Sequence, residues 1–193
     1  MSSQIGLRTL ILNADMMPTN LLTLKANPVE DAICRILNKT CIMLDAYPRG
    51  FKRSEFGGTR EYIPVPSVMY TKKYFQRPEI LPLHDNYLLL RDDYQCVYCG
   101  MPLNEDSMTW DHYIPESKGG PKTWSNILSS CSRCNHTYGD TPASKKKPKH
   151  KPYTPSYGEM VSLRRKRPII LDHKSWIPWI GKWSGEIIVL DKG

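Results

Sequence analysis

Six cysteines stand out in this 193-residue chain, because the spacing of four of them is suited to binding a metal ion. They form two C-x-x-C pairs, Cys96 with Cys99 and Cys131 with Cys134. Two intervening residues let both sulfurs turn toward one ion, and Gly100 can adopt the left-handed conformation that completes such a turn. Four thiolates form a closed tetrahedral set that favours Zn²⁺ and leaves no position for water. We therefore expect a structural zinc; an iron–sulfur cluster or a redox pair is the alternative.

The segment between the two pairs, residues 100–130, is longer than in an ordinary zinc finger, so we expect it to hold something further. It contains T-W-D-H, ending in Asp111 and His112, then S-K-G-G, and then T-W-S-N, ending in Asn126. Asn135 directly follows the last cysteine. The alternating residues around Asp111 predict a strand, on which Asp111 and His112 point to opposite sides and do different jobs unless the strand bends.

The order C-x-x-C-G, T-x-D-H, S-K-G-G, T-W-x-N and C-x-x-C-N resembles the HNH endonuclease family, in its branch braced by a four-cysteine zinc. The resemblance covers about residues 91–142. It implies a β-hairpin followed by a helix around a catalytic metal, the ββα-metal or His-Me finger fold. It also implies that His112 is the general base and that Asp111 and Asn135 hold a divalent ion. Asn126 would fix the active-site loop and the orientation of the histidine.

The reaction implied by that resemblance is DNA hydrolysis, which needs a deprotonated water and charge relief on the phosphate. An imidazole with an ordinary pKa of roughly 6.5 can accept a proton from water near neutral pH. Oxygen ligands suit Mg²⁺ or Mn²⁺, and an ion with two protein ligands leaves room for phosphate oxygens and water. Residues 91–140 contain seven acidic and four basic residues, so without a bound cation they would repel phosphate. The resemblance implies products with 5′-phosphate and 3′-hydroxyl ends.

The positive charge of the chain is concentrated in one segment. Residues 141–167 hold nine Lys or Arg against the single acidic Glu159, a balance of +8 that equals the formal charge of the whole chain. The Pro- and Lys-rich composition predicts an extended basic arm that binds a polyanion without reading its sequence. A solvated, disordered tail is the alternative interpretation of such a run.

Several cations are expected to contact DNA phosphates. In the family, a Lys often stands three positions after the last Asn, whereas this chain has Tyr138, so we expect the following lysine run to replace that contact. Near Asn135, His136 is either a solvent-facing helix residue or a contact to the metal or a phosphate. The predicted DNA-binding residues are Lys118, Arg133, His136, Lys145, Lys146 and Lys147.

The elements around this site are predicted from local patterns. Residues 7–13 and 40–45 are apolar and read as strands. Between them, Asn27 is expected to cap a helix whose apolar positions from Val29 onward recur at offsets of 0, 3, 4, 7 and 8. Residues 62–70 are expected to form an edge strand, because prolines are disfavoured in central strands.

The expected fold class is α+β, in four consecutive regions. They are an N-terminal strand–helix–strand module (1–85), the zinc-braced HNH core (86–142), the basic Pro/Lys-rich arm (143–168) and an apolar, Trp-rich C-terminal segment (169–193). The first region loosely resembles the leader found in bacterial and phage members of the family.

Composition and motifs also exclude or leave open other classes of protein. No apolar run approaches 18 residues, which excludes a membrane span, and the N-terminus lacks the pattern of a secretory signal. We therefore expect a cytoplasmic protein of a bacterium or of a phage-infected cell. The alternative function is a zinc-braced DNA-binding module or an accessory subunit, for example of a phage DNA-packaging motor. DNA is the expected partner, and a protein partner or a homodimer stays open.

Overall fold

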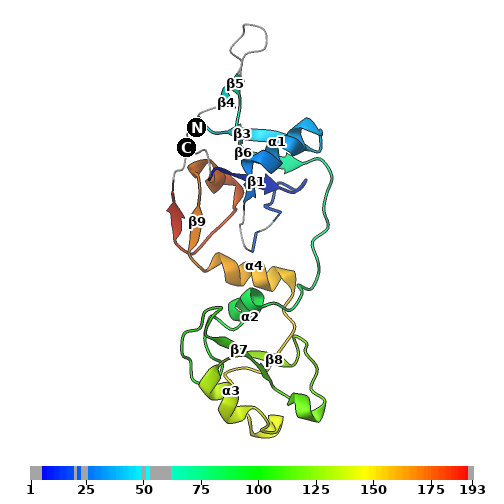
Figure 1. Cartoon of the computed structure of the whole chain (residues 1–193), viewed down its shortest axis with the longest axis vertical. Coiled ribbons are helices and arrows are strands. Elements are labelled where there is room, and N and C mark those ends of the chain that lie inside the picture. Colours follow the sequence, from blue (N-terminus) through cyan, green and yellow to red (C-terminus); the bar gives the residue numbers. More distant parts are fainter. Residues whose placement is uncertain (1–5, 20, 23–25, 49–50, 53–61, 191–193) are drawn as a thin grey trace. The chain divides into compact units, whose positions relative to one another are not determined.

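The computed structural model of the chain describes residues 6–19, 21–22, 26–48, 51–52 and 62–190. The chain divides into two compact units (Figure 1): unit 1 comprises Met1–Gln76 with Arg165–Gly193, and unit 2 comprises Arg77–Arg164. Unit 1 therefore combines the N-terminal module with the Trp-rich segment. Unit 2 contains the motif-bearing stretch and most of the basic segment. Among the described residues, no helix has the length and apolarity needed to cross a bilayer.

Unit 1 is built on a four-stranded sheet in the order β2-β1-β6-β3. Its elements in chain order are β1 (Arg8–Leu12), β2 (Asn27–Pro28), α1 (Val29–Leu37), β3 (Cys41–Ala46), β4 (Phe51–Lys52), β5 (Tyr62–Ile63) and β6 (Pro66–Thr71). Strand β6 runs parallel to β1 and antiparallel to β3, while β4 and β5 pair separately. The strands predicted over residues 7–13 and 40–45 are confirmed as β1 and β3.

Two sequence-based expectations for this sheet are wrong. Strand β6 is central, not an edge strand, because it pairs with β1 on one side and β3 on the other. Pro64 precedes the strand and Pro66 is its first residue, which is a position where a missing N–H is tolerated. The helix cap is also displaced: Asn27 pairs with Thr9 in β2, so Pro28 occupies the N-cap position without a side-chain bond.

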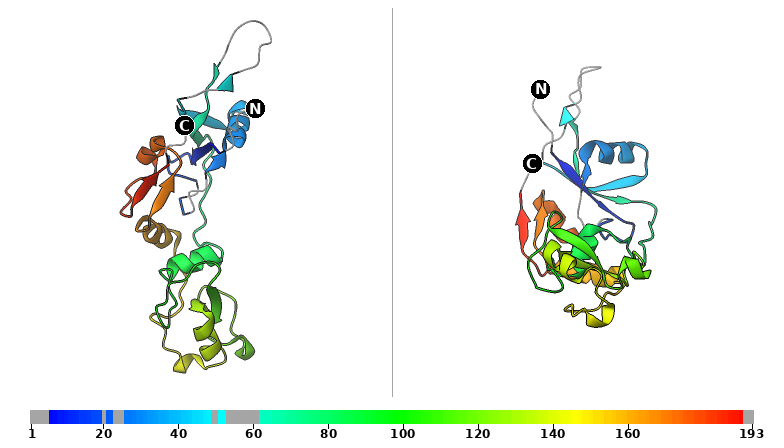
Figure 2. Two further views of the ribbon diagram at one scale, coloured as in Figure 1. Left: turned by 60° about the vertical axis from the view of Figure 1, so that its left-hand side comes forward. Right: turned by 60° about the horizontal axis from the view of Figure 1, so that its bottom comes forward.

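The apolar pattern of α1 places the helix on the sheet, where Figure 2 shows it in blue. Ala32 is fully buried and packs with Ile11, Cys41 and Met69 of three strands. The C-terminal elements belong to the same unit: β9 (Ile169–Leu171), the 3₁₀ helix η3 (Lys174–Trp179) and β10 (Ile187–Val189), which pairs with β9 in parallel. Trp176 of η3 is buried, and its indole N–H donates to the carbonyl oxygen of Ser67, 2.9 Å away.

Unit 2 contains the β-hairpin and helix that the cysteine motifs predict. Its elements are α2 (Asp85–Arg91), β7 (Met108–His112), the 3₁₀ turn η1 (Glu116–Lys118), β8 (Ile127–Cys131), α3 (Ser132–Tyr138), the 3₁₀ turn η2 (Ala143–Lys145) and α4 (Tyr157–Arg165), which ends at the boundary of the unit. Strands β7 and β8 are antiparallel, with Met108 opposite Cys131 and His112 opposite Ile127. Helix α3 follows β8 directly. The mixed α+β fold is therefore confirmed, and the ββα order matches an HNH fold.

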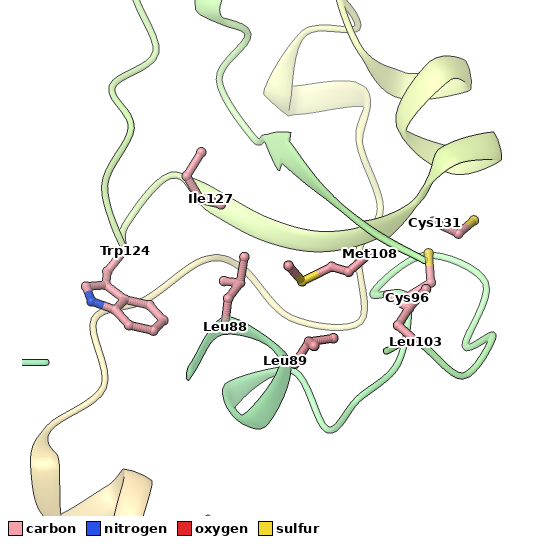
Figure 3. Packing of buried hydrophobic residues seen from close by; sticks show 8 residues of the cluster. All are labelled: Leu88, Leu89, Cys96, Leu103, Met108, Trp124, Ile127 and Cys131. Atoms are coloured by element: carbon pink, nitrogen blue, oxygen red, sulfur yellow. The ribbon is translucent and has the colours of Figure 1, made fainter. Parts of the chain in front are cut away.

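The core of unit 2 lies between α2 and the hairpin (Figure 3). Leu88 and Leu89 of α2 are almost fully buried, and they pack with residues of the hairpin and of both cysteine pairs. The cluster consists of Leu88, Leu89, Cys96, Leu103, Met108, Trp124, Ile127 and Cys131. Two zinc-ligand candidates thus form part of the hydrophobic core.

The Pro- and Lys-rich segment is extended over residues 146–156, but it is held against unit 2. The N–H of Lys149 donates to the carbonyl oxygen of Val97 at 2.7 Å, and its ammonium donates to Gln95 at the same distance. Arg91, which is buried, donates to the carbonyl oxygen of Tyr153 at 3.0 Å. Two of these three contacts use the backbone of the segment, which an apolarity pattern cannot reveal.

Helix α4 lies where the sequence analysis expected the arm to remain extended. Ser156 and Glu159 form a reciprocal cap at its start: the Ser156 N–H donates to the Glu159 carboxylate at 2.8 Å, and the Glu159 N–H donates to the Ser156 hydroxyl at 3.2 Å. This is the S-x-x-E capping box, and Met160 of the same helix is fully buried. The motif was present in the sequence and would have predicted this helix start.

His150 and Asp92 form a pH-sensitive tie between the basic segment and the body of unit 2. His150 Nε2 lies 3.4 Å from Asp92 Oδ1, and this contact raises the pKa of His150 above its ordinary 6.5. Burial would raise the pKa of Asp92, but hydrogen bonds from His150, Arg91 and the Ser129 N–H lower it below 3.8. A raised histidine pKa stabilises the fold below the unfolded value and loses that stabilisation as pH rises through the folded value. The lowered pKa of Asp92 acts at the acidic end of the pH range, since its contribution to stability is lost as pH falls through the folded value.

We therefore predict that unit 2 loses stability between pH 6 and pH 8.5, and that His150→Asn removes this part of the pH dependence. The expected loss is below about 1 kcal/mol, because His150 is partly exposed and solvent screens the pair. Urea unfolding of the zinc-loaded protein and of the variant at both pH values measures it. An identical pH dependence in the two proteins would contradict a contribution of the His150–Asp92 pair to stability.

Candidate active site and zinc centre

The four cysteines of the two C-x-x-C pairs converge in unit 2. Their sulfur atoms all lie within 4.8 Å of one another, and all six cysteines of the chain are free thiols. Gly100 has a φ of +76°, and its N–H donates to the carbonyl oxygen of Cys96 at 2.8 Å, which closes the first turn as expected. In the second pair, Cys131 ends β8 and Cys134 lies in the first turn of α3.

The electrostatics of this cluster fit a dication. Burial alone would raise the pKa of Cys96, but backbone N–H groups of Cys99, Cys131 and Tyr98 donate to its sulfur and lower it to about 6. The pKa of Cys134 is raised by burial and by the surrounding thiols. Crowded sulfurs therefore cannot all ionise unless a cation joins them. A closed set of four soft donors is the arrangement that structural zinc requires.

Asp111 lies on β7, and its carboxylate is buried, with 1% of the residue exposed. Oδ2 accepts a hydrogen bond of 2.5 Å from the hydroxyl of Tyr98. The ammonium of Lys146 lies 3.0 Å from Oδ1 and 3.2 Å from Oδ2, and it also donates to the carbonyl oxygen of His112 at 2.6 Å. One of the lysines predicted to contact DNA is thus buried beside the predicted metal ligand.

Tyr98 is a further residue of this site that the sequence analysis missed. Burial raises its pKa well above the ordinary value, as do the hydrogen bond to Asp111 and the charge of that carboxylate. Its ring stacks on Tyr138 of α3, with ring centroids 4.5 Å apart. The hydroxyl therefore remains a donor that fixes Asp111. Tyr98 lies inside the first C-x-x-C pair, and this position was the signal that could have placed it near the site.

Asn126 closes the loop between the two strands of the hairpin. Its amide oxygen accepts from the N–H of Ile114 at 2.8 Å, and its amide nitrogen donates to the carbonyl oxygens of Ile114 and Pro121. The residue is buried, and its backbone carbonyl accepts from the N–H of Tyr113 at 2.8 Å. The carboxamide thus holds the backbone that directly follows His112.

Gly120 is required for this loop, because a Cβ there would lie 1.8 Å from the Ile114 carbonyl oxygen and 2.9 Å from Asn126 Nδ2. We predict that Gly120→Ala destabilises the protein by about 3 kcal/mol or more, since the obstacle is backbone and not a flexible side chain. Gly158→Ala is the matched control: it lies in α4 with nothing within 4 Å of the added Cβ. It should be neutral or stabilise by about 0.5–1 kcal/mol. Urea unfolding of both variants checks the difference, and equal effects would contradict the packing described.

Asn135 joins α3 to β7. Its amide nitrogen donates to Thr109 Oγ1 at 3.1 Å and to the Trp110 carbonyl oxygen at 3.3 Å. The amide oxygen of the same carboxamide is not used in these two bonds. The residue lines an open pocket with Thr109, Ser132, His136, Gly139 and Asp140. The carboxamide therefore lies beside the strand that carries Asp111 and next to a solvent-accessible hollow.

His112 is half-buried at the end of β7, on the strand face opposite to Asp111. Trp110 shares its face, where the indole N–H donates to Asp85 at 2.6 Å and the ammonium of Lys122 lies 4.3 Å from the ring centroid. On a regular strand, alternation directs the imidazole away from the buried Asp111–Lys146 ion pair.

The remaining predicted DNA contacts lie on the surface of unit 2. Lys118 donates to the carbonyl oxygen of Asp140 at 3.1 Å, which ties the η1 turn to the end of α3. The exposed members are Lys118, Arg133, His136, Lys145 and Lys147. Lys146 differs from them because its side chain is 0% exposed.

A comparison with protein families finds a match over the part of the chain that contains this site. Residues 96–147 match the model of an HNH endonuclease family, from the first zinc-ligand candidate to the end of the lysine run. These residues form an HNH endonuclease domain. The HNH domain occupies about a quarter of the chain and contains the cysteine cluster, the hairpin and α3.

A curated relative supports the same assignment. The chain is 38% identical over 53 residues to a protein of Corynebacterium diphtheriae named CRISPR-associated endonuclease Cas9. The match spans 27% of this chain and only 5% of that much longer protein. No solved structure matches the chain significantly. Membership of the HNH domain in an endonuclease family supports nuclease activity in general.

Proposed function

We propose that the HNH domain hydrolyses DNA phosphodiester bonds with a divalent ion and leaves 5′-phosphate and 3′-hydroxyl ends. One observation carries this proposal: the Asn135 amide of α3 donates to the carbonyl oxygen of Trp110, the residue directly before Asp111 and His112. A carboxamide, a carboxylate and an imidazole are thus supplied by neighbouring positions of α3 and β7. These are the groups that a metal-assisted hydrolysis requires.

The donor chemistry of the site fits a hard cation. Asp111 and Asn135 offer oxygen atoms, and oxygen is the ligand that Mg²⁺ and Mn²⁺ prefer. These two residues would hold the ion, which when bound would stabilise the charge that develops on the phosphate and on the leaving 3′-oxygen. The zinc centre would serve this site indirectly, because Cys131 and Cys134 fix the junction between β8 and α3.

His112 is the proposed general base. Its imidazole accepts a proton from the attacking water, whose oxygen forms the new bond to phosphorus as the bond to the 3′-oxygen breaks. Asn126 holds the backbone that follows the histidine. This contact limits the movement of the strand end that carries the base.

Exposed cations of the same domain are proposed to bind the DNA backbone. Lys145 and Lys147 flank the buried Lys146 and are both exposed, and Arg133 lies on the exposed side of α3. Contacts of this kind add affinity without reading sequence, and each neutralised phosphate makes binding more dependent on salt.

We predict that the double variant Lys145→Ala/Lys147→Ala weakens DNA binding and reduces the slope of log K against log salt by about 2, one contact per lysine. Fluorescence anisotropy at several salt concentrations measures this slope, in a His112→Ala background that prevents cleavage. Lys182→Ala, an exposed lysine of unit 1, is the control and should leave the slope unchanged. A slope unaltered by the double variant would indicate that these lysines are solvated surface residues that do not contact DNA.

One observation favours a second function, a zinc-braced DNA-binding module or accessory subunit without catalysis of its own. The charge of Asp111 is already compensated by Lys146, and both side chains are buried. A purely structural ion pair would account for this contact. Incubation of supercoiled plasmid with Mg²⁺ or Mn²⁺ separates the two functions: nicking supports the nuclease, and binding without nicking supports the module.

A further inference from the structure

The lysine run contains one residue that behaves differently from its neighbours. The side chain of Lys146 is 0% exposed, whereas Lys145 and Lys147 are both exposed. Its ammonium has three N–H groups, and three oxygen atoms surround it: both carboxylate oxygens of Asp111 and the carbonyl oxygen of His112. Each N–H group of the amine therefore has an oxygen acceptor nearby. The carboxylate that it contacts belongs to Asp111, which lies 35 residues earlier in the chain.

This position conflicts with a second cation at the same carboxylate. A divalent ion ligated by Asp111 would lie within a few ångströms of an ammonium that touches both of its oxygens. Two positive charges so close in a buried site repel each other strongly. An ammonium whose carboxylate has been taken would also remain buried without a counter-ion, which is costly. The ion and the ammonium therefore exclude each other from Asp111.

The local backbone allows Lys146 to leave. The N–H of Lys146 donates to Ala143 within the same short turn, and the next backbone tie to the body of unit 2 is the Lys149 N–H on Val97. The residues on either side of Lys146 already lie at the surface. Release of the amine thus requires rearrangement of a few residues and leaves the hydrophobic cluster intact.

We propose that Lys146 is a tethered counter-ion of Asp111, which the catalytic divalent ion displaces when it binds. The inference rests on the proposed function, in which Asp111 is a metal ligand. Displacement exposes Lys146 between Lys145 and Lys147, so metal loading and the completion of a three-lysine phosphate-binding run are one event. Metal-free protein keeps the carboxylate neutralised and the run incomplete.

The test measures the reactivity of each lysine in the zinc-loaded full-length protein. Trace acetylation with and without saturating Mg²⁺, followed by mass spectrometry of peptides that span residues 143–151, reports on the three lysines separately. Without Mg²⁺, Lys146 is expected to react at least tenfold more slowly than Lys145 and Lys147. With Mg²⁺, its rate should rise to theirs. Lys146 that stays protected at saturating Mg²⁺ would overturn the proposal.

Asp111→Asn separates failure of this inference from failure of the proposed function. In the variant, Lys146 should react rapidly without Mg²⁺, and calorimetry should show Mg²⁺ binding weakened at least tenfold. Mg²⁺ binding that Asp111→Asn leaves unchanged, or no Mg²⁺ binding by the native protein, would overturn both proposals. Binding that requires Asp111 while Lys146 stays protected would overturn the exchange alone.

Lys146→Met supplies an independent readout. Removing the competing cation should tighten Mg²⁺ binding at least tenfold, whereas Lys147→Met should leave it within twofold of the native value. Affinity in Lys146→Met equal to or weaker than native would contradict competition. If loss of the buried ion pair prevents folding of this variant, the acetylation of native protein still decides the question.

Discussion

Replacing His112 with alanine is expected to lower Mg²⁺-dependent cleavage of supercoiled DNA by about 10²- to 10⁴-fold, the usual contribution of a general base. The imidazole is half-buried at the end of β7, so its removal leaves no tightly packed cavity. The loss should therefore appear in the rate and not in stability. Initial rates of nicking, with urea unfolding of the same preparations, measure the two effects separately.

His84→Asn is the matched control for this experiment. His84 caps α2 by accepting from the N–H of Asn86, and asparagine can make the same cap. The control should cleave at the native rate. Cleavage by His112→Ala at the native rate would remove the proposed base. Failure of the native protein to cut any DNA, including branched substrates, would favour the DNA-binding module.

Removing zinc is expected to unfold unit 2. Binding of a structural zinc is worth about 10–16 kcal/mol at pH 7, which matches or exceeds the roughly 5–15 kcal/mol stability of a typical domain. Cys96 and Cys131 also belong to the hydrophobic cluster with Leu88 and Leu89, so loss of the ion disturbs the core directly. Unit 1 contains none of the four ligands and should keep its own fold.

Hydrogen exchange before and after chelation measures this prediction region by region. Amides of unit 2 should lose protection when stoichiometric zinc is removed, and those of unit 1 should retain it. Cys131→Ser should reproduce the loss, whereas Cys34→Ser, an exposed cysteine outside the cluster, should retain zinc and stability. A cooperative melt of unit 2 in zinc-free protein would contradict a structural role for the metal.

Local patterns predicted much of this molecule. The C-x-x-C spacing anticipated the convergence of four sulfurs, because two intervening residues fix the turn geometry. The alternating residues around Asp111 anticipated strand β7. The apolar offsets after Val29 placed α1, although the pairing of Asn27 in β2 moved its start.

The contacts that were missed depend on distant parts of the chain. Nothing in the sequence K-K-K distinguishes Lys146 from its neighbours; its burial follows from the position of Asp111, 35 residues earlier. The bond from Trp176 to Ser67 spans 109 residues and likewise carries no local signal. The central position of β6 depended on which strands pair with it, which a proline count cannot show.

The most direct test of the nuclease proposal is the chemistry of the ends it leaves. Supercoiled plasmid nicked by the zinc-loaded protein with Mg²⁺ should be resealed by DNA ligase without further treatment, because ligase joins a 5′-phosphate to a 3′-hydroxyl. Resealing of the native product, together with no product from His112→Ala, is the result we predict. Absence of cleavage under all metal conditions, or nicks that ligase cannot close until the ends are enzymatically repaired, would contradict it.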